Sequence, residues 1–138
     1  MRQAIAEAEK ALKQGEVPIG AVIVCNDRII ARGHNLVETL GDPTAHAEMQ
    51  VITAATDAIG GKYLPECTLY ATVEPCPMCA AAAYWAHIGK IVYGATDPKR
   101  GFSTISRALI HPKTKVESGV LAEEPARLMT LFFQKKRD

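Results

Sequence analysis

Apolar residues recur at helical spacing at the start of the chain and at strand-like spacing after it. The positions at helical spacing are Ala4, Ile5, Ala8, Ala11 and Leu12. Their repeat of three to four residues predicts an amphipathic helix over residues 1–14. Two apolar runs, 20–25 and 28–33, then flank Asn26-Asp27. Because asparagine and aspartate are typical of tight turns, these runs predict a β-hairpin.

Strand-like and helical segments alternate along the rest of the chain. The predicted segments are helices over 45–58, 75–87 and 125–135, and strands over 68–73, 90–95 and 115–121. Asp42-Pro43-Thr44 supplies capping residues and a proline for the start of the first of these helices, and Gly60-Gly61 ends it. Strands that alternate with helices after a hairpin predict an α/β fold, a three-layer α/β/α sandwich on a mixed sheet. We expect one domain, 1–138.

Composition favours a cytoplasmic protein. The formal net charge of +1 gives no general electrostatic reason to expect a membrane surface or nucleic acid as partner. No apolar run approaches the ~20 residues that a membrane-spanning helix needs, and the N-terminal segment is amphipathic rather than signal-like. The four cysteines do not suggest a disulfide scaffold, and Cys25 and Cys67 are expected to be small core residues. A reducing compartment fits this usage best.

The strongest chemical signal is His46-Ala47-Glu48 followed by Pro75-Cys76-Pro77-Met78-Cys79. One imidazole and two thiolates make a three-ligand zinc set, and catalytic zinc sites keep the fourth position open for water. The pattern is the known signature of zinc nucleobase deaminases, in which the glutamate moves protons and is not a ligand. Both halves are predicted at helix starts on one edge of the sheet, where open α/β folds bind ligands. Residues two apart on a helix do not share a face, so His46 and Glu48 converge only if the histidine reaches around the helix end.

Simpler interpretations explain less of the pattern. A C-x-x-C pair also occurs in redox disulfides and in structural zinc knuckles, but a knuckle needs a second close ligand pair, and the redox interpretation gives His46 and Glu48 no role. A zinc-stabilised binding module without activity would have no use for Glu48. His34, His87 and His111 stand alone in the sequence and are expected to fill ordinary surface or core roles.

The chain resembles the bacterial tRNA adenosine deaminases of the cytidine deaminase-like superfamily over nearly its whole length. The segments that resemble them begin with GEVPIGAV at 15–22 and continue with GHN at 33–35, DPTAHAE at 42–48, LYATVEPCPMC at 69–79 and VYGATD at 92–97. The resemblance implies that His46, Cys76 and Cys79 bind Zn²⁺ and that Glu48 shuttles protons. It further implies substrate contacts from Asn35, the Ala47 backbone and Ile19, and a homodimer formed through Ala80–Ala83.

Two substrates remain open from the sequence. The resemblance and the basic Lys135-Lys136-Arg137 end favour adenosine in a tRNA anticodon loop. A salvage deaminase of a free base or nucleoside (guanine, cytosine or adenosine) is the alternative. Three segments depart from the tRNA enzymes: Tyr84-Trp85, Gly101-Phe102-Ser103 and Lys113-Thr114-Lys115. Tyr84-Trp85 is similar to the guanine deaminases, and the pair is expected to wall the substrate pocket or to pack in the core.

Overall fold

Helices and strands alternate as the hydrophobic pattern predicts. The structure, a computed structural model, describes residues 1–137. The helices are α1 (Arg2–Lys13), α2 (Val37–Leu40), α3 (Ala47–Ile59), α4 (Pro77–Trp85) and α5 (Glu123–Arg137). The strands are β1 (Gly20–Cys25), β2 (Arg28–His34), β3 (Cys67–Val73), β4 (Lys90–Ala95) and β5 (Lys115–Glu117), and two 3-10 turns, η1 (Phe102–Thr104) and η2 (Arg107–Leu109), lie between β4 and β5.

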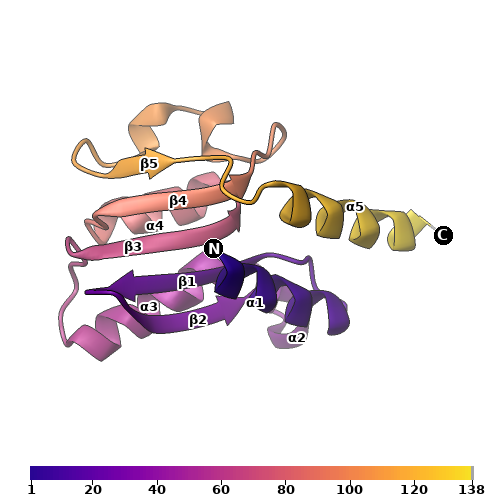
Figure 1. The fold of residues 1–138 in the computed structure, drawn as a ribbon, viewed down its shortest axis with the longest axis horizontal. Helices are drawn as coiled ribbons and strands as arrows, with labels where there is room; N and C mark the ends of the chain where they lie inside the picture. Colours follow the sequence, from indigo (N-terminus) through magenta and orange to yellow (C-terminus); the bar gives the residue numbers. More distant parts are fainter. Residues whose placement is uncertain (138) are drawn as a thin grey trace.

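Within the described residues, the strands form one mixed sheet in the order β2-β1-β3-β4-β5. The pairs on the β2 and β1 side are antiparallel, whereas β3, β4 and β5 run parallel. Helices α3 and α4 cover one face of this sheet, and α1 and α5 lie on the other face, with α5 extending past the sheet edge (Figure 1). The predicted three-layer α/β/α sandwich on a mixed sheet is confirmed.

Element boundaries differ from the predicted ones where local hydrogen bonding decides them. The helix expected from residue 45 begins at Ala47, because Asp42 Oδ1 accepts hydrogen bonds from the amide and the hydroxyl of Thr44 and closes a turn instead of capping the helix. The strand expected to reach residue 121 ends at Glu117, since Gly119 and Leu121 adopt positive φ angles. The short helix α2 was not predicted, because four residues are too few to show a period.

The hairpin turn forms as the sequence predicts. Asn26 and Asp27 both have positive φ angles, 52° and 62°, which is the backbone of the turn type that best matches twisted antiparallel strands. The turn places the ends of β1 and β2 at one end of the sheet. Ile19 and Asn35, which lie just outside these strands, are therefore at the opposite end.

The main core lies between the sheet and helices α3 and α4. Its residues include the alternating side chains Ile23, Leu69 and Ile91 from three neighbouring strands, together with Val51 of α3. On the other face, α1 packs so closely on β1 that a Cβ atom at Gly20 would lie closer than 3.0 Å to backbone atoms of α1. Among residues 1–137, no helix combines the length and apolar character that crossing a membrane requires.

Replacing Gly20 with alanine tests this close packing. The added methyl group would push α1 away from the sheet, so we expect Gly20→Ala to lower the free energy of unfolding by about 1–3 kcal/mol or more, the usual cost of overpacking. Gly61→Ala is the matched control, because nothing lies within 4 Å of its Cβ position. Urea unfolding measures both variants, and equal stability would contradict the packing described here.

Candidate active site

His46 and Cys76 stand at equivalent positions, each immediately before a helix. His46 is the N-cap of α3 and Cys76 is the N-cap of α4, and both have extended backbones, with ψ angles of 153° and 167°. An N-cap residue is outside the helical repeat, so its side chain is not confined to one helix face. This removes the difficulty of the two-residue spacing, because only Glu48 is inside the helix while His46 approaches from its end.

The two helix starts bring three metal-binding atoms together. Nδ1 of His46 lies 3.5 Å from Sγ of Cys79 and 3.6 Å from Sγ of Cys76, and all three donor atoms lie within 4.8 Å of one another. Zinc bonds of ~2.0–2.1 Å to nitrogen and ~2.3 Å to sulfur, at a tetrahedral angle, place such donors about 3.5 Å apart. The arrangement therefore has the dimensions of a zinc ligand set.

The surroundings of the sulfur atoms favour the thiolate. The hydrogen bond with Cys79 lowers the pKa of Cys76 to about 4, and His46 adds to this effect. Cys76 and Cys79 also belong to the N-terminal turn of α4, where unpaired amides create a positive potential. Thiolates at this position are ready to bind a cation.

Glu48 lies beside this group with one carboxylate oxygen unused. Only 3% of the residue is exposed, and its Oε1 is the one buried side-chain oxygen or nitrogen within the described chain that has no hydrogen-bond partner. Burial raises the pKa of Glu48 to about 7. A buried oxygen without a partner is costly unless a ligand or cation completes it, so the carboxylate suits a site that is finished by a metal and its water.

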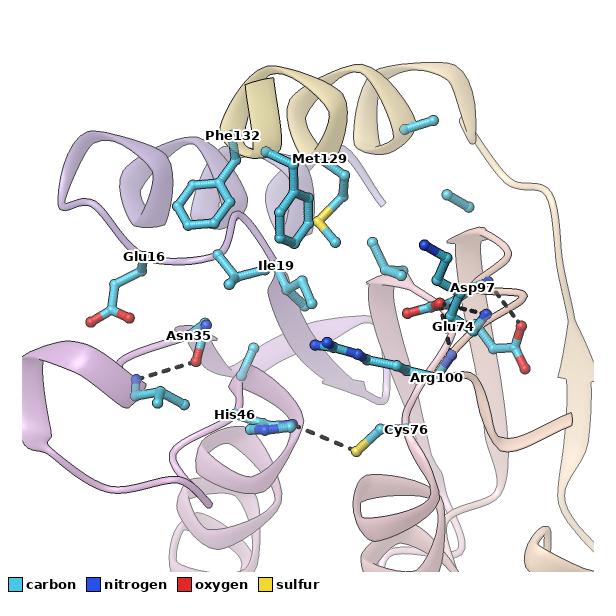
Figure 2. A pocket seen from close by; sticks show the side chains of 18 of the residues that line it. Glu16, Ile19, Asn35, His46, Glu74, Cys76, Asp97, Arg100, Met129 and Phe132 are labelled. Carbon is cyan, nitrogen blue, oxygen red and sulfur yellow. Dashed lines mark hydrogen bonds between the residues drawn. The ribbon is translucent and has the colours of Figure 1, made fainter. Parts of the chain in front are cut away.

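A cavity of about 800 Å³ opens over this cluster, at the ends of β3 and β4. Figure 2 shows Ile19 and Asn35 on one side of it, His46 and Cys76 at its base, and Met129 and Phe132 of α5 across from them. Ala47, whose contact was inferred from the resemblance, also lines the cavity. The sheet edge at which the ligand site was predicted is thus the edge that carries the cavity.

Glu16, for which sequence analysis predicted no role, shapes one wall of the cavity. It is completely buried and accepts hydrogen bonds from the amide of Glu38 and from the amide and hydroxyl of Thr39. Burial alone would raise its pKa, but these three bonds outweigh burial and hold the pKa below its ordinary value. The carboxylate therefore fixes α2, and with it the wall next to Asn35.

Glu74 has the same function on the opposite wall. Its carboxylate accepts hydrogen bonds from the amide of Asp97 and from the amide and hydroxyl of Ser103. A Cβ atom at Gly101 would lie closer than 3.0 Å to this carboxylate, so a larger residue there would displace the carboxylate from its hydrogen bonds. Gly101-Phe102-Ser103, one of the three departures in the sequence, is thus a loop built around Glu74.

Tyr84 and Trp85 do not line this cavity. They lie at the far end of α4 from Cys76, where Tyr84 contacts Trp85 and His111, and Trp85 is 75% exposed. Within a single chain, these two side chains do not reach the base of the cavity, and their contact with substrate stays a prediction.

The four alanines of the expected dimer face, Ala80–Ala83, do not all lie on the surface of the chain. Ala80 and Ala83 are buried in the chain's own core, whereas Ala81 and Ala82 remain partly accessible. The helical period separates the four alanines, so Ala80–Ala83 does not form one external face.

Nitrogen and sulfur donors at a cavity, with a buried carboxylate beside them, define a hydrolytic zinc enzyme. Residues 1–95 match the family described as cytidine and deoxycytidylate deaminase zinc-binding region, and the chain belongs to this family. It is a hydrolytic deaminase with zinc as its cofactor.

Relatives align along almost the entire chain. The tRNA-specific adenosine deaminase of Bacillus subtilis (strain 168) is 49% identical over 142 residues, which cover 99% of this chain and 88% of that protein. The protein of the same name from Agrobacterium fabrum is 44% identical over 99% of this chain and 93% of its own length. The Aquifex aeolicus protein of that name is 41% identical over 100% of this chain and 94% of its own.

Solved structures share the fold. A structure from studies of A-to-I editing by tRNA:A34 deaminases at the wobble position of transfer RNA has a TM-score of 0.85 at 43% identity, covering 93% of this chain and 96% of that chain. The guanine deaminase from Bacillus subtilis has a TM-score of 0.68 at 34% identity, covering 99% of this chain and 90% of its own.

Metal analysis tests the donor cluster directly. We expect about one zinc per chain, and we expect Cys79→Ala to lower both zinc content and the melting temperature, the latter by roughly 5 °C or more, because the ion joins two helix starts. Cys25→Ala is the matched control, since Cys25 lies at the far end of β1. Equal zinc content in the two variants would remove Cys79 from the ligand set.

Proposed function

We propose that this chain deaminates adenosine in the anticodon loop of tRNA, converting it to inosine with release of ammonia. The observation that carries the proposal is the wall that α5 adds to the zinc cavity. This wall combines the apolar side chains Met129, Phe132 and Phe133 with the cation of Lys136, whose Nζ lies 5.4 Å from the centre of the Phe132 ring. Aromatic and cationic side chains beside one groove are what unpaired nucleotides require.

The relatives support the same substrate. Three proteins named tRNA-specific adenosine deaminase are 41–49% identical to this chain, whereas the guanine deaminase is 34% identical. An anticodon loop also offers a base that is already unpaired, so extracting it costs less than extracting one from a duplex. The A34 wobble adenosine, the site of the structurally similar editing enzymes, is the position that we propose.

In this proposal His46, Cys76 and Cys79 would hold the zinc at the base of the cavity. Zinc, when bound, supplies the Lewis acid that makes the attacking water more acidic. Two thiolates formally cancel the charge of the ion, so it acidifies water less than a site with three histidines. The nearby carboxylate of Glu48 is needed to complete the activation.

Glu48 is the proposed proton shuttle. Its carboxylate accepts one proton from the water, whose oxygen forms a bond to C6 of adenine, and it passes this proton to the adjacent ring nitrogen. The second proton of the water moves to the amino group, the C6–N bond breaks, and ammonia leaves as the carbonyl forms. General acid–base catalysis of this kind contributes ~10²–10⁴-fold.

Three other residues orient the base. Asn35 is buried, and its Oδ1 accepts a hydrogen bond from the Val37 amide, so its amide nitrogen remains available to the ring or the ribose. Ala47, at the first turn of α3, offers backbone to the ring edge, and Ile19 forms an apolar wall. Together they would hold the amino carbon against Glu48.

The alternative is a salvage deaminase of free guanine, cytosine or adenosine. The likeness to guanine deaminase and the Tyr84-Trp85 pair favour it. However, Tyr84 and Trp85 lie outside the cavity of the single chain, and a neutral base uses none of the cationic wall. We therefore rank it second.

We also propose a cytoplasmic homodimer of a single domain, 1–138. On the outer side of α4, Trp85 is exposed, and Ala81 and Ala82 leave room for another backbone to approach closely. This surface, rather than Ala80–Ala83, is the proposed dimer face. Four cysteines without a disulfide and a tRNA substrate both fit the cytoplasm.

Ammonia release from an anticodon hairpin, compared with guanine, cytosine and adenosine at equal concentration, tests the function. We expect turnover on the hairpin, and inosine should replace adenosine at the wobble position. Robust turnover of a free base with none on the hairpin would support the salvage alternative instead.

Glu48→Gln tests the proton shuttle. The variant should keep its zinc and its melting temperature but lose at least ~10²-fold in kcat, because an amide cannot accept the proton. Glu38→Gln, a carboxylate on the rim of the same cavity, should retain most of the activity. If Glu48→Gln lost its zinc, Glu48 would be a ligand and its proposed role would be wrong.

A further inference from the structure

The guanidinium of Arg100 points into the cavity. Figure 2 shows the side chain extending from the loop beyond Asp97 toward the centre of the cavity, between the His46 and Cys76 side and the α5 side. Over residues 1–136, its side chain makes no hydrogen bond or ion pair. A positive group in this position, next to the proposed entry of the base, is available to an anionic ligand.

The loop that carries Arg100 is held firmly. The side chain of Asp97 accepts hydrogen bonds from the amides of Lys99 and Arg100, at 3.1 and 3.0 Å, and its carbonyl accepts one from Gly101. Phe102, which follows, is buried against Tyr93. The backbone of Arg100 is therefore fixed at both ends, and ligand binding need not order it first.

Glu74 ties this loop to the zinc site. It receives bonds from both ends of the loop, at Asp97 and Ser103, and it directly precedes Pro75-Cys76. The segment that presents Cys76 and the loop that presents Arg100 are thus joined through one buried carboxylate. This connection fixes the loop backbone that carries Arg100 relative to the segment that carries Cys76.

Apart from the exposed Glu38 on the rim, the acidic side chains that line the cavity are already engaged elsewhere. Glu16, Glu74 and Asp97 each direct their oxygens to backbone amides or hydroxyls, and Glu48 faces the metal-binding cluster. By contrast, the cations Lys99, Arg100 and Lys136 line the cavity from two elements, the loop after β4 and helix α5. The rim therefore offers positive charge to a substrate.

We propose that Arg100 binds a backbone phosphate adjacent to the adenosine that enters the zinc cavity, an inference that rests on the proposed function. A guanidinium pairs with two phosphate oxygens at once, which gives both strength and a defined orientation. Arg100 thereby distinguishes a nucleotide within a strand from a neutral base or nucleoside, which offers it no anion. It acts in specificity and positioning, whereas the chemistry belongs to Glu48 and the metal.

The first test compares Arg100→Ala and Arg100→Lys with Arg28→Ala. Arg28 is an exposed arginine at the hairpin end of the sheet, away from the cavity, and serves as the matched control. We expect Arg100→Ala to lower kcat/KM on the anticodon hairpin roughly tenfold or more, and Arg100→Lys to recover part of the loss, since lysine keeps the charge but not the paired geometry. Any slow turnover of free adenosine should be unchanged, and zinc content and melting temperature should match the wild type.

Two further measurements test the contact between Arg100 and a phosphate: the salt dependence of hairpin binding, and the replacement of single phosphates by uncharged groups. Loss of one phosphate contact should reduce the slope of log K against log salt by about 0.7 for a single strand. A series of hairpins, each with one neutral methylphosphonate in place of a different phosphate, locates the contact. At one linkage the replacement should lower the activity of the wild-type enzyme but should not lower the activity of Arg100→Ala any further. Such non-additivity indicates that the two changes remove the same interaction.

The outcomes separate this inference from the proposed function. If the wild-type enzyme edits the hairpin and Arg100→Ala edits it equally well, or if the variant is as sensitive as the wild type at every linkage, the phosphate contact is wrong and the function stands. If the wild-type enzyme does not edit the hairpin at all, the function is wrong and this contact falls with it.

Discussion

The convergence of two helix N-termini at one edge of the sheet is the constraint on which the site depends. His46 and Cys76 are both N-caps, so each side chain leaves its helix at the end where unpaired amides create positive potential. The parallel pairing of β3 and β4 delivers the chain to the start of α4 at the same edge at which the cavity opens. A binding position for a cation with thiolate ligands follows from this geometry before any metal arrives. A metal bound by His46, Cys76 and Cys79 would join α3 to α4 and so link the chemistry of the enzyme to its stability.

Two buried carboxylates, Glu16 and Glu74, hold the walls of the cavity at this edge of the sheet. Glu16 holds α2 on one wall, and Glu74 holds the loop of Asp97 and Ser103 on the other, each by three hydrogen bonds. Buried carboxylates are costly unless their oxygens are satisfied, so such groups specify one loop conformation rather than several. The walls are therefore rigid where Asn35 and Arg100 are presented. This pre-organisation lets substrate binding energy be used at the reacting carbon instead of for ordering loops.

In the proposed function, Arg100 and the α5 wall contribute to substrate selection from a part of the chain that lies apart from the residues proposed to perform the chemistry. The metal-binding residues and Glu48 belong to the segment that matches the deaminase family, residues 1–95, whereas Arg100 and the α5 wall lie beyond it. The likeness of this fold both to a tRNA-editing structure and to a guanine deaminase is consistent with that division.

The sequence by itself determined the order of helices and strands, the hairpin at Asn26-Asp27 and the set of residues around His46, because periodicity, turn chemistry and ligand type are local properties. It did not reveal the roles of Glu16 and Glu74 or the proposed role of Arg100, since each depends on contacts with residues more than twenty positions away or on the shape of a cavity. It also assigned Ala80–Ala83 to one external face, although the helical period of α4 separates these alanines. Only the tertiary structure decided these points, because a single position in the sequence does not indicate which distant backbone amides a buried carboxylate will bind or which way a helix turns its faces.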